Sequence, residues 1–325
     1  MPAFRHEALF YAGEDGFLAG TVPFLEQGAE RGENALVAVS KARADGLRAK
    51  LGDAADFVRF VDMAELGRNP ARIIPAWHDF VASRGGMAGE PIRGIGEPIW
   101  AGRSDTELVE CHRHESLLNL AFADRGDFWL MCPYDVDALP PEVLEEALHT
   151  HPVVDENGES GPSHAYLPPE LAPGPFDGTL AAPAAYPLDE FVFTIADLGA
   201  LRAFVQQRCL AAGHEPQRTA DLLLAMSELA TNSVTHGGGV GLLRHWCDNG
   251  ATVWEIRDSG RFEDPRLGRE TPPPSGTSGR GLWLVNQVSD LVQMRSDGSG
   301  SVVRVRMNVA AEGSGAYPSP ERLPV

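Results

Sequence analysis

Lysine is almost absent from this chain of 325 residues, in which only Lys41 and Lys50 occur, both in the first half. No GxxxxGK[ST] loop is present, so the sequence lacks the lysine-bearing loop with which one large class of proteins holds nucleotide phosphates. The formal net charge of −19 argues against direct binding to nucleic acid. Any phosphate bound by this chain must therefore be held by arginine, backbone amides or a metal ion.

Cysteine and long apolar runs are also scarce. The four cysteines, Cys111, Cys132, Cys209 and Cys247, form no CxxC pair, which indicates neither a disulfide framework nor a zinc knuckle. No stretch approaches the roughly 18 uncharged apolar residues that span a bilayer. The first residues lack the basic start and long apolar middle of a signal peptide. We therefore expect a cytoplasmic protein that does not enter a membrane.

The length and composition predict two soluble globular domains. Residues 1–150 carry 14 basic and 25 acidic side chains, whereas residues 183–310 carry 12 and 14, so the second block is better suited to an anionic ligand. Residues 153–187 are rich in proline, glycine, alanine and acid and are predicted to be an extended linker. The tail, residues 311–325, is predicted to be disordered for the same compositional reason.

In the first half, short apolar segments alternate with helical segments, which predicts a mostly parallel α/β sheet covered on both faces. Ser40 and the Ser104–Glu107 capping-box pattern are predicted to begin two of the helices. The expected strands are residues 7–12, 35–40, 57–63, 92–98 and 128–135, and the expected helices are residues 16–31, 40–51 and 104–124, with two more after Pro70 and Pro141.

One of these helices carries side chains that bind metals elsewhere. Cys111, His114 and Glu115 occupy neighbouring positions of one helix face, from which a metal or haem site could be built. A packed or solvated face is the alternative, and the sequence leaves both open for Cys111, His112 and His114. The His114-Glu115 pair superficially resembles the phospho-accepting pair of sensor kinases. In those kinases the pair lies on a helix directly before the ATPase domain. Here it lies within the first predicted domain, far upstream of the second, so we reject that interpretation.

Residues 1–152 resemble the MEDS sensory domain. The resemblance runs from HEALFYAGEDGFLAGTVPFLEQG through WLMCPYD to the acidic helix PPEVLEEALHTHP. It implies a RecA-like fold without the phosphate loop, and a module that senses a small-molecule signal whose identity the sequence does not give.

In the second half, strands and helices follow an order that predicts a two-layer α+β sandwich. The last two strands are expected to form a hairpin across residues 297–300. The expected strands are residues 191–195, 241–247, 251–258, 291–296 and 301–308, and the expected helices are residues 197–212, 221–239 and 281–289.

The helix over residues 221–239 carries a polar line. Glu228, Asn232 and His236 are each four residues apart, so they lie near one edge of the helix. An amide oxygen such as that of Asn232 is a hard ligand suited to a magnesium ion that carries phosphates. Glu228 is suited to orient or deprotonate the group that attacks them. The alternative is a stripe that is merely solvated.

Two further segments strengthen the first interpretation. The strand ATVWEIRDSG ends on Asp258, whose carboxylate can accept the adenine amino proton while Gly260 lets the base lie against the backbone. A glycine-rich loop then opens a helix, so that backbone N–H groups at the helix start can point at phosphates. The residues expected to contribute from this loop are Thr277, Ser278, Gly279, Arg280 and Gly281.

The order E-x-x-x-N, D-x-G, G-x-G resembles the GHKL (Bergerat-fold) ATPases over residues 188–310. Within that group, SELATNSVTHG, WEIRDSG and GTSGRGLWLVNQVSDLVQMRSDGSGSVVRVRM are most similar to the anti-sigma-factor serine kinases. The resemblance implies ATP and magnesium as cofactors, with Asn232 as the magnesium ligand, Glu228 as general base and Asp258 as the reader of adenine. It implies a pocket lined by His236, Gly260, Gly279 and Gly281.

The same resemblance implies the partners. These are an anti-anti-sigma (STAS) protein phosphorylated on serine and a sigma factor that is sequestered, with the kinase acting as a homodimer. The chain departs from the family at Phe262, which occupies the second glycine position of D-x-G-x-G. This departure favours an alternative, an ATP-binding regulator or scaffold without kinase turnover.

Overall fold

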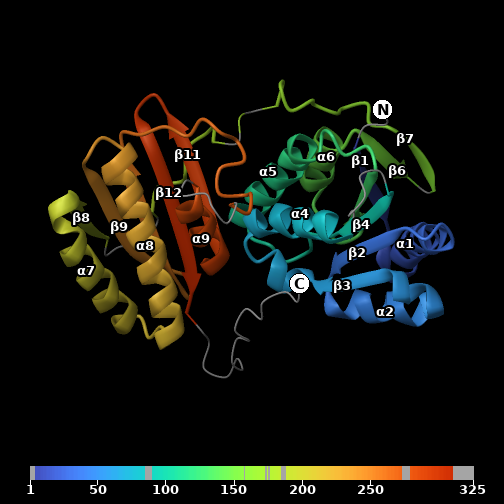
Figure 1. The fold of residues 1–325 in the computed structure, drawn as a ribbon, viewed down its shortest axis with the longest axis horizontal. Helices are drawn as coiled ribbons and strands as arrows, with labels where there is room; N and C mark the ends of the chain where they lie inside the picture. Colours follow the sequence, from blue (N-terminus) through green and yellow to red (C-terminus); the bar gives the residue numbers. More distant parts are fainter. Residues whose placement is uncertain are drawn as a thin grey trace. The chain divides into compact units, whose positions relative to one another are not determined.

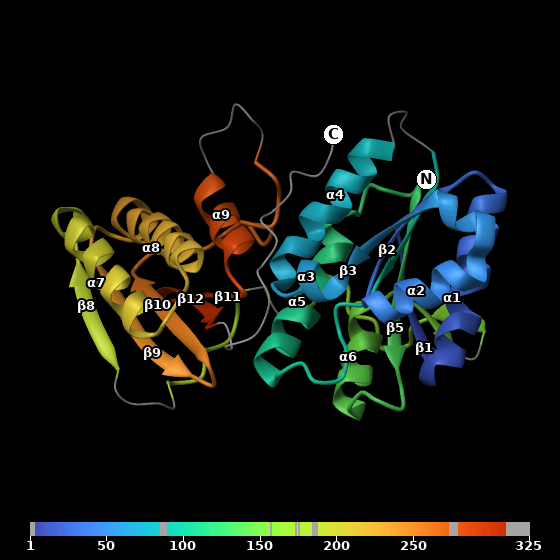
Figure 2. The same cartoon turned by 90° about the horizontal axis from the view of Figure 1, so that it is seen from below.

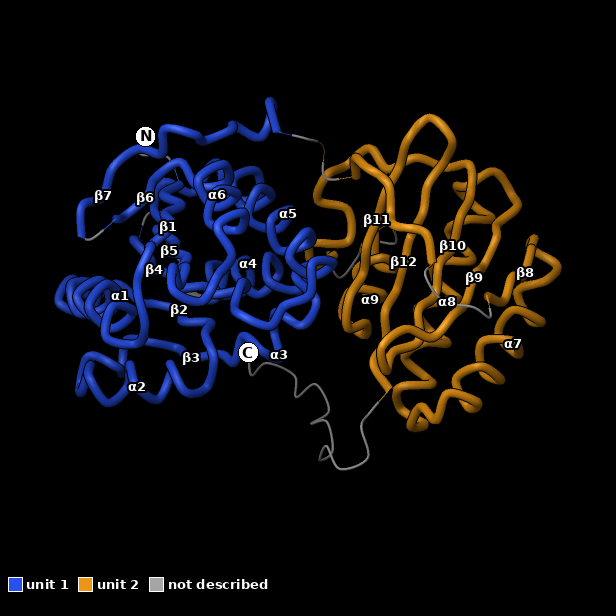
Figure 3. Tube along the Cα trace, turned by 180° about the vertical axis from the view of Figure 1, so that it is seen from behind, with its two compact units in different colours: residues 1–173 blue, residues 174–325 orange. Residues whose placement is uncertain are grey.

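The computed structural model describes residues 4–84, 90–156, 158–172, 174, 176–183, 188–272 and 279–309. The chain divides into two compact units, Met1–Pro173 and Gly174–Val325, which are described separately (Figure 3). The predicted disordered tail, residues 311–325, lies outside the described residues. None of the described helices is long and apolar enough to cross a membrane.

The first unit is built on a seven-stranded sheet in the order β3-β2-β4-β5-β1-β6-β7 (Figure 1). All neighbouring strands are parallel except β6 and β7. The predicted, mostly parallel α/β sheet is thereby confirmed. The strands are β1 (Arg5–Tyr11), β2 (Asn34–Val39), β3 (Val58–Asp62), β4 (Ile92–Gly96), β5 (Phe128–Asp135), β6 (Val153–Glu156) and β7 (Glu159–Pro162).

Helices cover both faces of this sheet. The apolar side chains of α1 and α2 pack with one face in one cluster, and those of α4, α5 and α6 pack with the other face in a second cluster. Ser40 accepts a hydrogen bond from the Arg43 N–H at the start of α2, and Ser104 forms the predicted capping box with Glu107 at the start of α5. The helices are α1 (Gly13–Glu30), α2 (Lys41–Leu51), α3 (Met63–Leu66), α4 (Ile73–Arg84), α5 (Asp105–Ala121) and α6 (Pro141–Thr150).

The structure corrects the predicted linker. Residues 153–156 form β6, which pairs with β1, and residues 159–162 form β7 at the edge of the same sheet. Further along, the Phe176 ring lies 5.1 Å from the Phe262 ring, so this part of the stretch packs within the second unit. Residues 184–187 of the predicted linker lie outside the described residues. Residues 153–156 and 159–162 therefore belong to the sheet of the first unit, and the predicted extended linker does not begin at residue 153.

The second unit is a two-layer sandwich. Its sheet is antiparallel, in the order β11-β12-β10-β9-β8, and Figure 2 shows α7, α8 and α9 on one face of it. The predicted α+β arrangement, including the β11–β12 hairpin across residues 297–300, is confirmed and is consistent with the Bergerat fold. The elements are β8 (Asp189–Phe193), α7 (Leu198–Ala211), α8 (Pro216–His236), β9 (Gly241–Asp248), β10 (Ala251–Asp258), α9 (Arg280–Val288), β11 (Leu291–Asp297) and β12 (Gly300–Asn308).

Helix α8 lies in the middle of the helical layer, where it contacts both α7 and α9. It begins at Pro216, five residues before the predicted start, because proline at the first helical position lacks only an N–H that would be unpaired anyway. The Leu222, Met226 and Leu229 side chains are buried, and each contributes about 1.5–3 kcal/mol of hydrophobic stabilisation. The helix ends before glycines 237–239, as predicted, and the last two of these have positive φ.

Asp197 precedes α7, but its side chain caps no N–H of that helix. Its carboxylate accepts from the N–H and the hydroxyl of Thr194, at 3.0 and 2.7 Å. It therefore closes the short turn before α7 rather than the helix itself.

Candidate functional site

A cavity of about 420 Å³ opens in the second unit between α8, the end of β10 and the start of α9. This volume is within the usual range for small-molecule sites. Glu228, Asn232 and His236 line it from α8, as their four-residue spacing predicted. The other predicted residues that line it are Asp258, Gly260, Gly279 and Gly281. Three segments that are distant in sequence thus meet at one site.

Asp258 is held at the end of β10 by three donors. Its Oδ1 accepts from the Gly260 N–H at 2.8 Å and from the Ser301 hydroxyl at 2.7 Å, and its Oδ2 accepts from the Ser233 hydroxyl. A carboxylate has about four acceptor positions, so among the described residues one position on Oδ2 is left over. The side chain lines the cavity, which makes this position suitable for an amino group of a ligand.

The start of α9 has a geometry suited to an anion. Gly279 precedes the helix in the left-handed region, with φ of 80°, a conformation that glycine adopts without strain. Gly279 at the N-cap position supplies no side-chain hydrogen bond to the helix, and the first N–H groups of an α-helix have no acceptor within the helix itself. Such N–H groups and the helix dipole favour phosphate. This end of the cavity can hold an anion without lysine.

Gly281 lies against the two polar residues of α8. A β-carbon at this position would lie 2.6 Å from Glu228 Oε2 and 3.5 Å from Asn232 Nδ2. Only glycine therefore lets α9 approach α8 this closely with the Glu228 carboxylate in its present position.

Phe262 lines the cavity from the position where the family pattern has its second glycine. Its backbone N–H donates to Ser296 Oγ at 3.2 Å, and its ring packs against Phe176. The side chain is half-buried in the apolar cluster of this unit. The segment that follows Gly260 is thus anchored by an aromatic contact rather than left as a glycine hinge.

Some predicted residues are not placed at the cavity. Thr277 and Ser278 lie outside the described residues. Arg280 is exposed at the first position of α9 and is not among the described residues that line the cavity. Ser233 and Ser301, which fix Asp258, were not predicted. Ser301 pairs with Asp258 across β10 and β12, and the hairpin pattern alone does not give that register.

The metal-binding residues considered on the α5 face separate in the structure. Cys111 is buried and donates to the Pro98 carbonyl oxygen at 3.4 Å, and burial raises the pKa of its thiol to about 12. His114 and Glu115 are also buried, with exposures of 1% and 0%. A buried histidine is a poor phosphate acceptor, which agrees with the rejection of a sensor-kinase pair. Only Glu115 joins a cluster of possible metal ligands.

Two family models match the chain. Residues 5–152 match MEDS, the methanogen/methylotroph, DcmR sensory domain, and residues 191–307 match the histidine kinase-like ATPase domain. These matches confirm both domain resemblances drawn from the sequence. No curated protein matches the chain.

Among solved structures, the chain is similar to the crystal structure of the RsbU and RsbW domains of Rv1364c from Mycobacterium tuberculosis, at 13% identity and a TM-score of 0.29. That match covers 65% of this chain and 49% of the other, so the chain spans about half the length of the protein it matches.

Proposed function

Since a MEDS sensory domain precedes a histidine kinase-like ATPase domain in this chain, we propose that the protein is a sensory anti-sigma regulator with serine kinase activity. In this proposal the second domain binds Mg-ATP, phosphorylates a serine of a STAS-type anti-anti-sigma partner and sequesters a sigma factor. The protein acts in the cytoplasm as a homodimer, and the first domain controls it in response to a small-molecule signal.

The observation that carries the proposal is the convergence of α8, β10 and α9 on one cavity. Its residues fit a magnesium nucleotide: an acceptor position on Asp258 for the adenine amino group, a hard oxygen ligand on Asn232 for the metal, and the N-terminal end of α9 for phosphates. When bound, magnesium neutralises phosphate charge and ATP supplies the phosphoryl group.

Glu228 is positioned for the transfer step. It lines the cavity one helical turn before Asn232, so its carboxylate and the metal ligand share one edge of α8. As the serine oxygen forms its bond to the γ-phosphorus and the bond to the leaving ADP oxygen breaks, Glu228 accepts the serine proton. His236, at the end of the same edge, also lines the cavity.

The direct test is transfer of label from γ-labelled Mg-ATP to a candidate STAS protein. We expect phosphoserine on the STAS protein, formed only when both magnesium and the full-length chain are present. A STAS variant with the accepting serine replaced by alanine is the matched control. Absence of phosphoserine, despite measurable ATP binding, would remove the kinase assignment.

That negative result would instead support a second candidate function, that of an ATP-binding regulator without kinase turnover. The observation that favours it is Phe262, whose ring lies in the cavity wall and packs on Phe176. In this case ATP would alter capture of the sigma factor without being consumed. Partner capture measured with ATP and with a non-hydrolysable analogue would then give equal results.

Gly281→Ala is expected to lower phosphoryl transfer without lowering the stability of the fold. Alanine stabilises a helix by roughly 0.5–1 kcal/mol relative to glycine, so the melting temperature should stay the same or rise. The new β-carbon displaces the Glu228 carboxylate, and a misplaced catalytic group lowers phosphoryl transfer by about 100-fold.

Gly199→Ala is the matched control for this prediction. Gly199 is also the second residue of a helix of this domain, but it is exposed and a β-carbon there meets no atom within 4 Å. It should show the same change in stability with unchanged transfer. Parental transfer by Gly281→Ala would contradict the proposed place of Glu228.

A further inference from the structure

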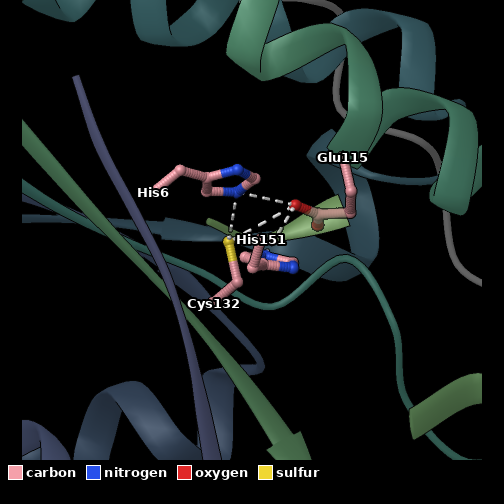
Figure 4. Close-up of side chains that lie close together, drawn as sticks. All are labelled: His6, Glu115, Cys132 and His151. Carbon is pink, nitrogen blue, oxygen red and sulfur yellow. Dashed lines mark hydrogen bonds and ion pairs between the residues drawn. The ribbon is translucent and has the colours of Figure 1, made fainter. Parts of the chain in front are cut away.

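A second polar cluster lies in the first unit, far in sequence from the ATPase residues. It consists of His6, Glu115, Cys132 and His151, which come from β1, α5, β5 and the residue after α6 (Figure 4). All four side chains are buried, none with more than 1% of its surface exposed. One potential ligand atom from each lies within 4.8 Å of the others. The proposed kinase chemistry uses none of these residues.

The topology of the sheet brings these residues together. Strands β5 and β1 are adjacent and parallel, and His6 pairs with Leu130, two residues before Cys132. His6 and Cys132 therefore project from the same face. That face is covered by α5 and α6, which place Glu115 and His151 over it. Figure 4 shows the four side chains pointing toward a common centre.

The spacing of the ligand atoms corresponds to a tetrahedral metal site. Glu115 Oε2 lies 3.0 Å from His6 Nε2 and 3.4 Å from His151 Nε2. Cys132 Sγ lies 3.5 Å from both His6 Nε2 and Glu115 Oε2. Metal–ligand bonds of about 2.0–2.3 Å give tetrahedral edges of roughly 3.3–3.6 Å. Four ligand atoms define six distances, which are the edges of the tetrahedron. The four distances given above are therefore already close to the length that a bound ion requires.

Both imidazole rings are held with Nε2 facing the centre. His151 Nδ1 lies 2.9 Å from the Ala147 carbonyl oxygen, which can only accept, so Nδ1 carries the hydrogen. The Asn119 amide donates to the Thr150 carbonyl oxygen at 2.8 Å, which directs its own oxygen at His6 Nδ1, 3.1 Å away. Metal-binding histidines show this arrangement, with one nitrogen on the metal and the other donating to an oxygen.

The cluster gathers buried acceptors. In the neutral form of both rings the hydrogen sits on Nδ1, so two bare Nε2 atoms face the Glu115 carboxylate oxygen, and all three are acceptors. Within the described part of the chain, Glu115 Oε1 and His151 Nε2 are buried without a hydrogen-bond partner. Buried acceptors in this arrangement are costly unless they share a cation.

We propose that His6, Glu115, Cys132 and His151 bind one divalent first-row transition metal ion, with Zn²⁺ as the preferred ion. Two neutral imidazoles, one thiolate and one carboxylate neutralise a divalent ion completely, so the loaded site carries no net charge in the protein interior. Nitrogen and sulfur ligands in tetrahedral geometry suit zinc rather than magnesium or calcium. Because the ligands join two strands to two helices, metal occupancy couples to the stability of the sensory domain.

Cobalt is the probe that tests this site. The full-length protein is stripped with a chelator and titrated with Co²⁺ in the absence of nucleotide. We expect saturation at one equivalent, with a thiolate-to-cobalt charge-transfer band in the near ultraviolet and the intense visible bands of four-coordinate cobalt. Zn²⁺ should remove both signals by displacement and should raise the temperature at which the first domain unfolds.

Variants identify the sulfur ligand. Cys132→Ser should abolish the charge-transfer band. Cys111→Ser, which alters a second buried thiol of the same domain that is bonded to Pro98, should retain it. A parent protein that binds no cobalt at one equivalent would overturn the proposal whether or not the variants fold, and would identify the cluster as a network that shares a proton. Persistence of the band in Cys132→Ser would overturn it equally.

Discussion

Glu228→Ala is expected to lower phosphoryl transfer to the STAS partner by about 10²–10⁴-fold, the usual contribution of a general base. Affinity for Mg-ATP should change little, because the proposed adenine contact at Asp258 and the proposed phosphate contacts at the start of α9 are untouched. The half-buried Glu228 side chain lines the cavity without belonging to the apolar core, so its truncation should leave folding intact. Single-turnover transfer and equilibrium nucleotide binding, measured on the same preparation, separate the two effects.

Two comparisons make this prediction specific. Glu215→Ala removes an exposed carboxylate from the start of the same helix, where its side chain caps no N–H, and should transfer phosphate at the parental rate. Asn232→Ala removes the proposed magnesium ligand and should weaken both binding and transfer. If Glu228→Ala transferred phosphate as fast as the parent, the assignment of the base would be incorrect.

Asp258→Asn is expected to weaken ATP binding by about 10- to 150-fold, the value of a hydrogen bond to a charged group. The reason lies in the donors that already surround the carboxylate. The Gly260 N–H is fixed and points at Oδ1, so the amide oxygen must take that position. The amide nitrogen then replaces Oδ2, and an acceptor directed at the adenine amino group becomes a donor.

The same reversal predicts a change in base preference. Guanine presents a carbonyl oxygen where adenine presents its amino group, so the variant should lose much less affinity for GTP than for ATP. Competition between the two nucleotides for the full-length protein measures this directly. Asp248→Asn is a suitable control, because it lies on β9 at the opposite end of the β9–β10 hairpin, outside the cavity. An unchanged ratio of ATP to GTP affinity in Asp258→Asn would show that this carboxylate does not read the base.

The sequence predicted those parts of the site that depend on local periodicity. The spacing of Glu228, Asn232 and His236 fixes their common edge on any α-helix, and the cavity lies along that edge. Asp258 and Gly260 are two residues apart at a strand end, and their hydrogen bond is equally local. The capping box of Ser104 and Glu107 was predictable for the same reason.

Contacts that depend on strand order could not be predicted. Ser301 reaches Asp258 only because β12 pairs with β10 in one particular register. The His6, Glu115, Cys132 and His151 cluster depends on β5, β1 and β6 being neighbours, which the chain order does not reveal. The helix-face pattern included Glu115 but grouped it with Cys111 and His114, which are not part of the cluster.

The predicted linker shows what amino-acid composition alone could not predict. Strands β6 and β7 are four residues each, and their polar, glycine-containing sequence has no clear alternation. They form because the free edge of β1 offers backbone groups for β6 to pair with. Such pairing depends on main-chain hydrogen bonds rather than on apolar side chains, so the sequence pattern did not reveal it.

The account depends most on magnesium-dependent nucleotide binding at the cavity between α8, β10 and α9. Equilibrium dialysis of the full-length protein against labelled ATP, with and without Mg²⁺, tests it most directly. We predict saturable binding of one ATP per chain that weakens when magnesium is withdrawn and weakens again in Asp258→Asn. Absence of saturable uptake in the presence of magnesium would contradict the account.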